Sequence, residues 1–214
     1  MTSACTKALW LPLAAACALG SSGAEAAEWR FRVLLDGVAI GEHRFSVTRA
    51  EDERQVVSEA DFVVKLLGIP VYRYRHRASE SWRGDCLMQL ATFTDDDGKV
   101  SQVRARPGDN GRLDVTVNGA SRSLPGCTMT FAYWNPALRQ QTRLLNPQSG
   151  VEERVQIHRV GDGALDVRGE SVVAQHWRIE GPAAPLDVWY SRQGDWIGLD
   201  STVAGGRRLS YRLQ

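Results

Sequence analysis

The strongest constraint on the fold is the spacing of turn-forming dipeptides, which recur at short and fairly regular intervals along the chain. Asn-Gly and Asp-Gly supply the positive φ angles that tight hairpins require. Between the turns lie alternating segments rich in valine, tyrosine, tryptophan and threonine. This pattern predicts an all-β fold, an antiparallel β-roll or half-barrel in which many short strands follow one another as a meander. Examples of the turns are Asp36-Gly37, Asp97-Gly98, Asn110-Gly111 and Asn118-Gly119.

The first hairpin illustrates how the alternation sets the strand register. Across its two-residue turn, Leu35 pairs with Val38, and Val33 pairs with Ile40. Continuing this register would bury charged side chains of the second strand and expose its apolar ones. A slip of one residue removes the conflict, and Gly41 is the natural place for such a β-bulge. The slip places three side chains on the apolar face: His43, Phe45 and Val47.

One segment of the sequence is expected to be helical. Asn135 is a potential N-cap, Pro136 suits the first helical position, and Asn146-Pro147 ends the segment. Leu138 and Leu145 would then lie near one face of the helix. We expect one short helix that packs over the mouth or an open edge of the roll.

The stretch from Val71 to Trp82, VYRYRHRASESW, is either a basic ribbon for nucleic acid or a strand with two different faces. Alternate side chains of a strand point to opposite faces. The aromatic side chains then lie on the inner face, and the arginines form a solvated outer row. Glu59 and Asp61 on a neighbouring strand are the expected partners of these arginines. The formal net charge of +1 argues against the broad basic surface that nucleic acid requires.

The inner face of this stretch is the candidate ligand site. His76 and Glu80 are either a polar pair satisfied within the core or the polar anchors of an aromatic-lined cavity. A second aromatic cluster, from Phe131 to Trp134, precedes the predicted helix and belongs either to the core or to the rim of the same cavity. The candidate ligand-binding residues are Tyr72, Tyr74, His76, Glu80, Trp82, His43, Tyr133 and Trp134.

The segment from Leu66 to Pro70, LLGIP, is an apolar turn at a position where polar residues are typical. An exposed apolar patch marks a contact site, whereas a turn that packs against the body of the domain has no such role. The alternative to a ligand-binding protein is therefore an interaction or scaffold protein of the cell envelope. Such a protein would contact its partner through this turn or through an exposed strand edge.

Sequence motifs of catalysis and metal binding are missing from the chain. It has no nucleophile elbow, zinc-protease motif, phosphate-binding loop or dinucleotide fingerprint, although a site assembled from distant residues leaves no such motif. On a strand, His76 and Glu80 would be about 13 Å apart. The run from Asp95 to Lys99 lacks the alternating ligands of a calcium loop. We therefore expect a non-enzymatic protein without a metal or a cofactor.

The N-terminus has the pattern of an export signal. Lys7 precedes an apolar run from Ala8 to Gly20, and Ala24-Glu25-Ala26 fits a cleavage site. The apolar run is shorter than the roughly 20 residues that a membrane-spanning helix needs. We predict a signal peptide over residues 1–26, a single β domain over residues 27–214, and a periplasmic protein that is soluble after export.

The cysteines are consistent with an oxidising compartment. Cys17 offers lipidation as an alternative to cleavage, but Ala14 stands where lipid-attachment sites usually carry a larger aliphatic residue. Removal of the signal leaves Cys86 and Cys127. Two thiols in an exported protein predict one disulfide, and two free buried thiols are the alternative.

Several short motifs resemble those of a known family. A DG-x-x-I-G hairpin occurs at Asp36 to Gly41, an E-x-W pair with a G-x-x-L turn at Glu80 to Leu87, and a W-N pair at Trp134-Asn135. Over nearly all of the chain after the signal, the sequence is similar to exported bacterial proteins known only as a domain of unknown function. The resemblance implies an exported β-rich roll and no catalytic residue. Its closing pattern matches Trp189, Tyr190, Gly194, Gly198, Leu199, Gly206, Arg207, Tyr211 and Leu213.

Together these features favour an exported, non-enzymatic binding protein. We expect the roll to enclose a cavity for an apolar or amphipathic ligand of the cell envelope, such as a lipid or an acyl chain. Nucleic acid is not an expected partner, and peripheral contact with the envelope is compatible with this role.

Overall fold

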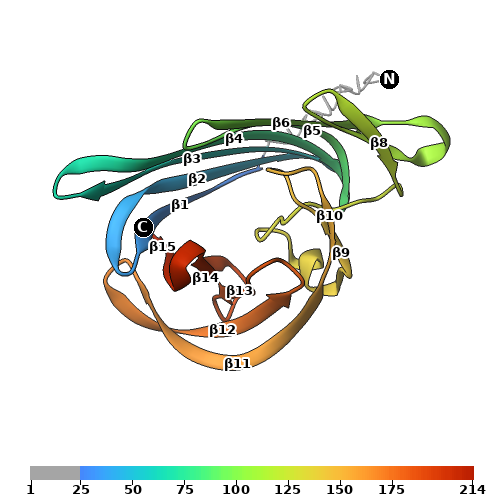
Figure 1. Ribbon diagram of the computed structural model, residues 1–214. Helices are drawn as coiled ribbons and strands as arrows, with labels where there is room; N and C mark the ends of the chain where they lie inside the picture. The colour runs from blue at the N-terminus through green and yellow to red at the C-terminus, as the bar shows by residue number, and fades with distance from the viewer. Residues whose placement is uncertain (1–24) are drawn as a thin grey trace, which may run out of the picture.

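The computed structural model describes residues 25–214, which fold mainly into β-strands (Figure 1). Thirteen strands form one antiparallel sheet in the order β11-β12-β13-β14-β15-β1-β2-β3-β4-β5-β6-β7-β8, and β9 and β10 form a separate two-stranded sheet. The predicted all-β antiparallel roll or half-barrel is confirmed. The strands are β1 (Glu25–Leu35), β2 (Val38–Ala50), β3 (Glu53–Leu66), β4 (Ile69–Arg83), β5 (Cys86–Asp96), β6 (Lys99–Pro107), β7 (Leu113–Val117), β8 (Ala120–Leu124), β9 (Arg143–Leu145), β10 (Glu152–Arg154), β11 (Gln156–Val167), β12 (Glu170–Glu180), β13 (Leu186–Tyr190), β14 (Trp196–Val203) and β15 (Arg207–Leu213).

β1 and β15, the first and last of these strands along the chain, are neighbours in the sheet. β1 pairs with β15, and Phe31 lies opposite Leu213. At the far end of this pair, the Asp36 carboxylate accepts hydrogen bonds from the Arg207 side chain (2.7 Å) and from the Arg208 backbone N–H (2.8 Å). The β1–β15 pair therefore joins an N-terminal half, β1 to β8, to a C-terminal half, β11 to β15.

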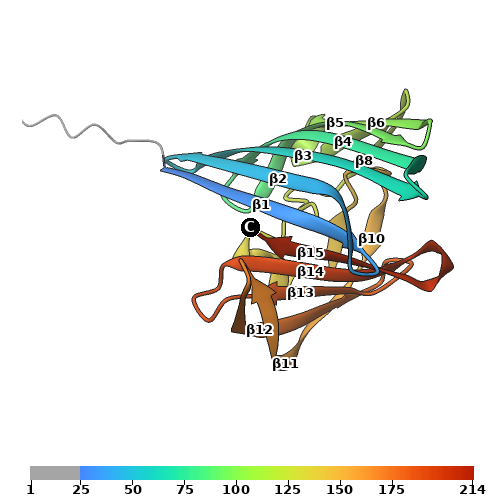
Figure 2. The same ribbon diagram turned by 90° about the vertical axis from the view of Figure 1, so that its left-hand side faces the viewer.

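The two halves of the sheet face each other across the core. They lie one above the other in both views of the ribbon, and β8 and β11 remain the two edges of the unclosed sheet (Figures 1 and 2). The Trp196 ring from β14, in the C-terminal half, packs against the N-terminal half, with its centroid 4.2 Å from that of Phe31 on β1 and 5.0 Å from that of Phe45 on β2. Fully burying such aromatic side chains is the main stabilising contribution between the halves.

The first hairpin has the predicted turn and a β-bulge close to the predicted place. Leu35 pairs with Val38, but the slip falls one residue earlier than expected, so Val33 pairs with Gly41 and not with Ile40. A Cβ atom at position 41 would overlap the backbone carbonyl of Asp61 on β3, which explains why glycine is required there. Beyond the bulge the predicted alternation holds, and His43, Phe45 and Val47 face inward.

β4 has the two faces that its sequence predicts. Its outer row of arginines is exposed, and the alternate residues from His76 to Trp82 are buried. Arg77 forms ion pairs with Asp61 (2.6 Å) and Glu59 (3.3 Å) on β3, which are the predicted partners. Exposed pairs of this kind contribute about 0–1 kcal/mol each, so inward burial of the apolar face determines the register of this strand.

The predicted helix is wrong in length and type. Asn135 caps the segment as expected, because its side-chain oxygen accepts a hydrogen bond from the Ala137 N–H (3.0 Å), but only a 3₁₀ helix over Pro136–Gln140 follows. Arg143–Leu145 then forms β9, and the Leu145 N–H donates to the Met129 carbonyl (2.8 Å). Non-local pairing that buries Leu144 and Leu145 outweighs the weak local helix preference.

The predicted disulfide is confirmed: Cys86 is bonded to Cys127 across a sequence separation of 41 residues. Cys86 begins β5, and Cys127 lies in the segment that follows β8. Next to the disulfide, the Leu87 N–H donates to the Thr128 carbonyl (3.0 Å). The bond thus fixes the start of a long connecting segment against the N-terminal half of the sheet.

Among residues 25–214, no helix is long and apolar enough to cross a membrane. Most of the predicted signal peptide, residues 1–24, lies outside the described residues, as does the alternative lipidation site at Cys17. Glu25 and Ala26, at the predicted cleavage site, begin β1 and pair with β2.

We expect loss of the disulfide to lower the free energy of unfolding by about 4 kcal/mol, because the closed loop restricts the unfolded chain. Urea unfolding of the double variant Cys86→Ser/Cys127→Ser measures this difference. Wild-type protein in a reducing agent is the matched control and should unfold at the same urea concentration as the variant. Equal stability of the oxidised and reduced proteins would contradict the prediction.

Candidate functional site

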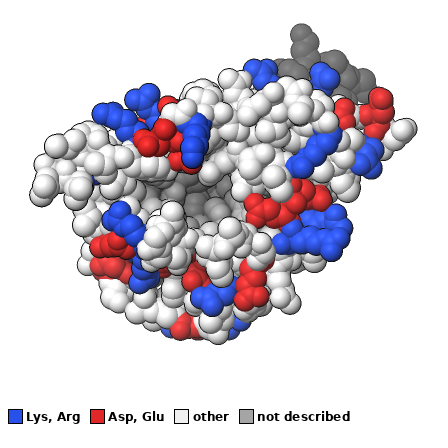
Figure 3. All heavy atoms as spheres, viewed as in Figure 1, with Lys and Arg blue, Asp and Glu red and all other residues white. Residues whose placement is uncertain are grey.

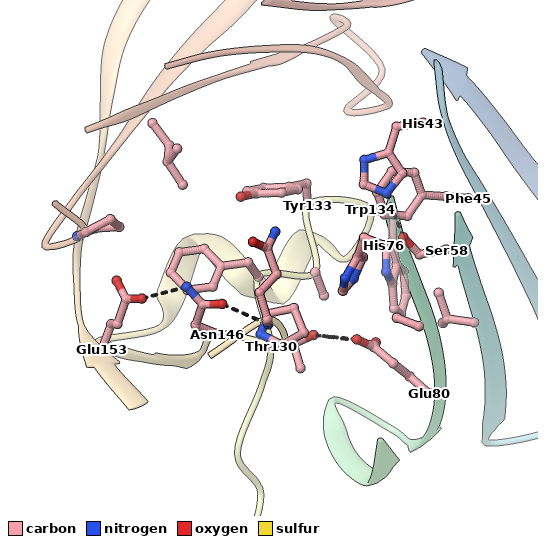
Figure 4. A pocket seen from close by; sticks show the side chains of 18 residues that line it. His43, Phe45, Ser58, His76, Glu80, Thr130, Tyr133, Trp134, Asn146 and Glu153 are labelled. Carbon is pink, nitrogen blue, oxygen red and sulfur yellow. Dashed lines mark hydrogen bonds between the residues drawn. The ribbon is translucent and has the colours of Figure 1, made fainter. Parts of the chain in front are cut away.

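A cavity of about 240 Å³ lies against the inner face of β2, β3 and β4. The opposite wall comes from the segment after β8, the β9–β10 hairpin and the connection between β12 and β13 (Figure 4). The cavity therefore depends on both halves of the sheet. Its lining residues are His43, Phe45, Val56, Ser58, His76, Ala78, Glu80, Thr130, Phe131, Ala132, Tyr133, Trp134, Asn146, Pro147, Gln148, Glu153, Pro182 and Leu186.

The sheet wall of the cavity follows directly from strand alternation and register. Side chains two residues apart share a face, and antiparallel pairing aligns them with the same face of the next strand. Aromatic or imidazole rings alternate here with small residues, which leaves space above the sheet. The cross-strand rows are His43–Ala60–His76, Phe45–Ser58–Ala78 and Val47–Val56–Glu80.

The opposite wall is held in place by a polar network beside the disulfide. The Asp85 carboxylate accepts hydrogen bonds from Asn135 Nδ2 and from the Arg54 guanidinium, both at 3.0 Å. Arg54 also bonds to the Gly84 carbonyl and stacks its guanidinium over the Trp134 ring, 5.1 Å from the centroid. The cavity-lining segment is therefore anchored to the turn between β4 and β5.

Glu80 is a buried carboxyl group at the cavity wall. Its oxygens accept hydrogen bonds from Trp82 Nε1 (2.9 Å) and from the Thr130 hydroxyl (3.2 Å). Burial removes solvent from the carboxylate and raises its pKa to about 7, while these two hydrogen bonds partly oppose the rise. Near neutral pH, Glu80 is therefore present in both its protonated and its ionised form.

Two histidines in the same wall are held uncharged. His43 Nε2 is hydrogen-bonded to the Ser58 hydroxyl (2.7 Å), and His76 Nδ1 to the Thr94 hydroxyl (2.8 Å). Burial lowers the pKa of His43 well below its ordinary value and lowers the pKa of His76 to about 4. Buried His43 Nδ1 has no hydrogen-bond partner among the described residues.

The structure brings together five of the eight candidate ligand-binding residues and separates the other three. His43, His76, Glu80, Tyr133 and Trp134 line the cavity. Trp82 lies in the core, with 1 % exposure, and donates its indole N–H to the Glu80 carboxylate. Tyr74 stacks on Phe62 in a neighbouring apolar cluster, and the Tyr72 hydroxyl donates to Asp96 at the surface (2.6 Å). A role in ligand binding stays a prediction for each of these residues.

Sequence reasoning missed most of the second wall. Thr130, Asn146 and Glu153 belong to a segment without strand alternation, so no periodic pattern identifies them. The two cysteines could have located part of this wall from the sequence. A Cys86–Cys127 bond places Thr130, three residues after Cys127, close to the inner face of the sheet near Glu80.

Residues 25–214 contain no group of three or more histidine, cysteine, aspartate or glutamate side chains able to hold a metal ion. The run from Asp95 to Lys99 is the hairpin turn between β5 and β6, in which the Gly98 N–H donates to the Asp95 carboxylate (2.8 Å).

Comparison with known proteins identifies the family of this chain. The family model described as Domain of unknown function (DUF6134) matches residues 31–214. The chain belongs to this family. The resemblance to an uncharacterised domain family is thereby confirmed, and the DUF6134 match covers both walls of the cavity. A comparison with curated proteins gives no match.

Among solved structures, a β-barrel-like protein of the domain of unknown function DUF1849 from Brucella abortus is similar to this DUF6134 protein. The similarity covers 87% of this chain and 94% of that chain, with a TM-score of 0.63 and 10% sequence identity. At this identity the likeness concerns the fold alone.

We expect Glu80→Gln to remove a pH-dependent loss of stability. Below about pH 4.5 the Glu80 carboxyl is protonated in the folded and in the unfolded protein. Between about pH 4.5 and pH 7 the carboxyl loses its proton in the unfolded protein only, which favours unfolding. Relative to wild type, the free energy of unfolding of Glu80→Gln should therefore rise by about 3 kcal/mol from pH 4.5 to pH 8. Urea unfolding across this range measures it.

The matched control for this experiment is Glu59→Gln, because Glu59 is an exposed carboxylate on the outer face of β3. Its stability relative to wild type should change little over the same pH range. A flat difference between Glu80→Gln and wild type would show that Glu80 is solvated in the folded protein.

Proposed function

We propose that this DUF6134 protein is an exported, non-enzymatic binding protein whose cavity takes an apolar or amphipathic ligand of the cell envelope, such as a lipid or an acyl chain. The observation that carries the proposal is the cavity itself. Ten of its eighteen lining residues are aromatic or apolar and eight are polar, and the polar residues Ser58, His76, Glu80 and Thr130 are buried. Small-molecule sites have this composition.

The size of the cavity limits what enters it. A volume of about 240 Å³ equals roughly eight water molecules at about 30 Å³ each. This is below the range of about 300–1,000 Å³ that encloses drug-sized ligands. A short chain, or one end of a longer molecule, fits. The molecule is hollowed between the two halves of the sheet (Figure 3).

Export is supported by two independent features. The N-terminal sequence has the charge, apolar run and small residues of a signal peptide. The Cys86–Cys127 bond is of a kind that persists in oxidising compartments and is rare in the cytosol. A periplasmic location is the proposal that fits both.

We expect native mass spectrometry of protein purified from its own host to detect a bound apolar or amphipathic molecule. The variant Ala78→Leu adds carbon atoms to the cavity wall and should reduce both the loaded fraction and the affinity for 1-octanol, the latter roughly tenfold. Tryptophan fluorescence follows the octanol titration, because Trp134 lines the cavity.

The matched control for this titration is Ala91→Leu, on the exposed face of neighbouring β5. It should bind octanol as wild type does. Absence of any co-purifying molecule, together with no response to octanol, would contradict the proposed function.

A second candidate function is supported by the apolar turn between β3 and β4. The turn projects as a hairpin tip and does not fold back onto the sheet (Figure 1). Leu66 is 64 % exposed, Leu67 95 % and Ile69 66 %. An apolar tip of this kind is suited to contact with a protein partner, which is the role of an envelope interaction or scaffold protein.

We expect a photo-crosslinking residue at position 67 to capture one defined partner in the living host, and the same residue at Lys99, on the polar β5–β6 turn, to capture none. Leu67→Ser should abolish the complex and change the free energy of unfolding by less than about 0.5 kcal/mol, because the side chain is solvent-exposed. Equal labelling from positions 67 and 99 would contradict this function.

A further inference from the structure

The charged groups of the cavity are all acidic. Glu80 and Glu153 line it, and none of its described lining residues is a lysine or an arginine. The two carboxyl groups lie on opposite sides of Thr130 and Asn146 (Figure 4). Each is held by uncharged donors: Glu80 by Trp82 and Thr130, and Glu153 by Asn146 Nδ2 (2.9 Å).

Neither carboxyl group forms an ion pair within residues 25–214. The adjacent residue on β10 provides the contrast, because the Glu152 carboxylate pairs with Arg143 on β9 (3.1 Å). Two consecutive residues thus differ in environment: Glu152 has a cationic partner, and Glu153 faces the cavity with an amide as its hydrogen-bond donor. A partly enclosed carboxylate without a counter-charge attracts a cation.

The other titratable groups around the cavity do not offset this charge. His43 from β2 and His76 from β4 are held neutral because burial lowers the pKa of each. Burial raises the pKa of Tyr133, so its hydroxyl also stays neutral. The guanidinium of Arg54 contacts the Trp134 ring but is already paired with Asp85.

We propose that the end of the ligand that enters the cavity carries an ammonium group, so that the ligand is an apolar or amphipathic amine with Glu80 and Glu153 as its counter-charges. This inference rests on the proposed function and narrows the ligand class. Aromatic rings in the wall are compatible with it, since ring faces attract ammonium groups. A carboxylate or phosphate end would instead meet like charge and find no cation.

The protonation of Glu80 is consistent with an ammonium ligand. In the empty cavity, burial keeps the carboxyl partly protonated near neutral pH. A neighbouring ammonium group favours the ionised form and releases that proton. Glu80 is therefore partly protonated without ligand and becomes ionised when an ammonium group binds.

The experiment compares three probes of equal chain length: octylamine, 1-octanol and octanoate. Calorimetric titration near neutral pH should rank their affinities in that order. Glu153→Gln and Glu80→Gln should each weaken octylamine binding roughly tenfold and change octanol binding by a much smaller factor. The matched control Glu152→Gln removes the carboxylate that already has a partner and should leave all three affinities unchanged.

Each outcome decides between the inference and the function on which it rests. Octanoate binding as tightly as octylamine, or octylamine binding that withstands both cavity substitutions, overturns the ammonium inference and leaves an apolar binding protein. Retained octanol binding shows that a variant still has a folded cavity. Failure of all three probes to bind wild-type protein overturns the proposed function and the inference together.

Discussion

The pairing of β1 with β15 is the contact on which the rest of the structure depends. It joins strands from the two ends of the chain, and the Asp36–Arg207 contact spans a sequence separation of 171 residues. Without it the N-terminal and C-terminal halves would be separate sheets, each with one apolar face in water. The cavity depends on the same pair, because β2 to β4 form one wall and Leu186, at the start of β13, contributes to the other.

Strand alternation predicts much of this architecture from the sequence alone. The two faces of β4 and the inward direction of His43 were within its reach, and the two cysteines left after the signal predicted the Cys86–Cys127 bond. Alternation identifies the face of a side chain but not its surroundings along the strand. Tyr74 and His76 therefore share a face, yet only His76 reaches the cavity.

Features that depend on distant parts of the chain were beyond local reasoning. Leu138 and Leu145 fit one face of a helix by spacing, but burial of Leu145 beside Met129 makes an extended strand more favourable. Glu153 has no periodic neighbours that would mark it as inward-facing. Its importance comes from the absence of a cationic partner, which only the packed structure reveals. Local patterns thus predict the sheet, and tertiary contacts determine the chemistry of the cavity.

The position of β1 also has a kinetic consequence. A chain made from its N-terminus produces β1 before the other strands of the sheet, so one edge of β1 stays unpaired until β15 has been made. Non-local strand pairing of this kind is slow, and an unpaired edge is open to wrong partners. This topology therefore exposes one edge of β1 to incorrect strand pairing until the C-terminal half is available.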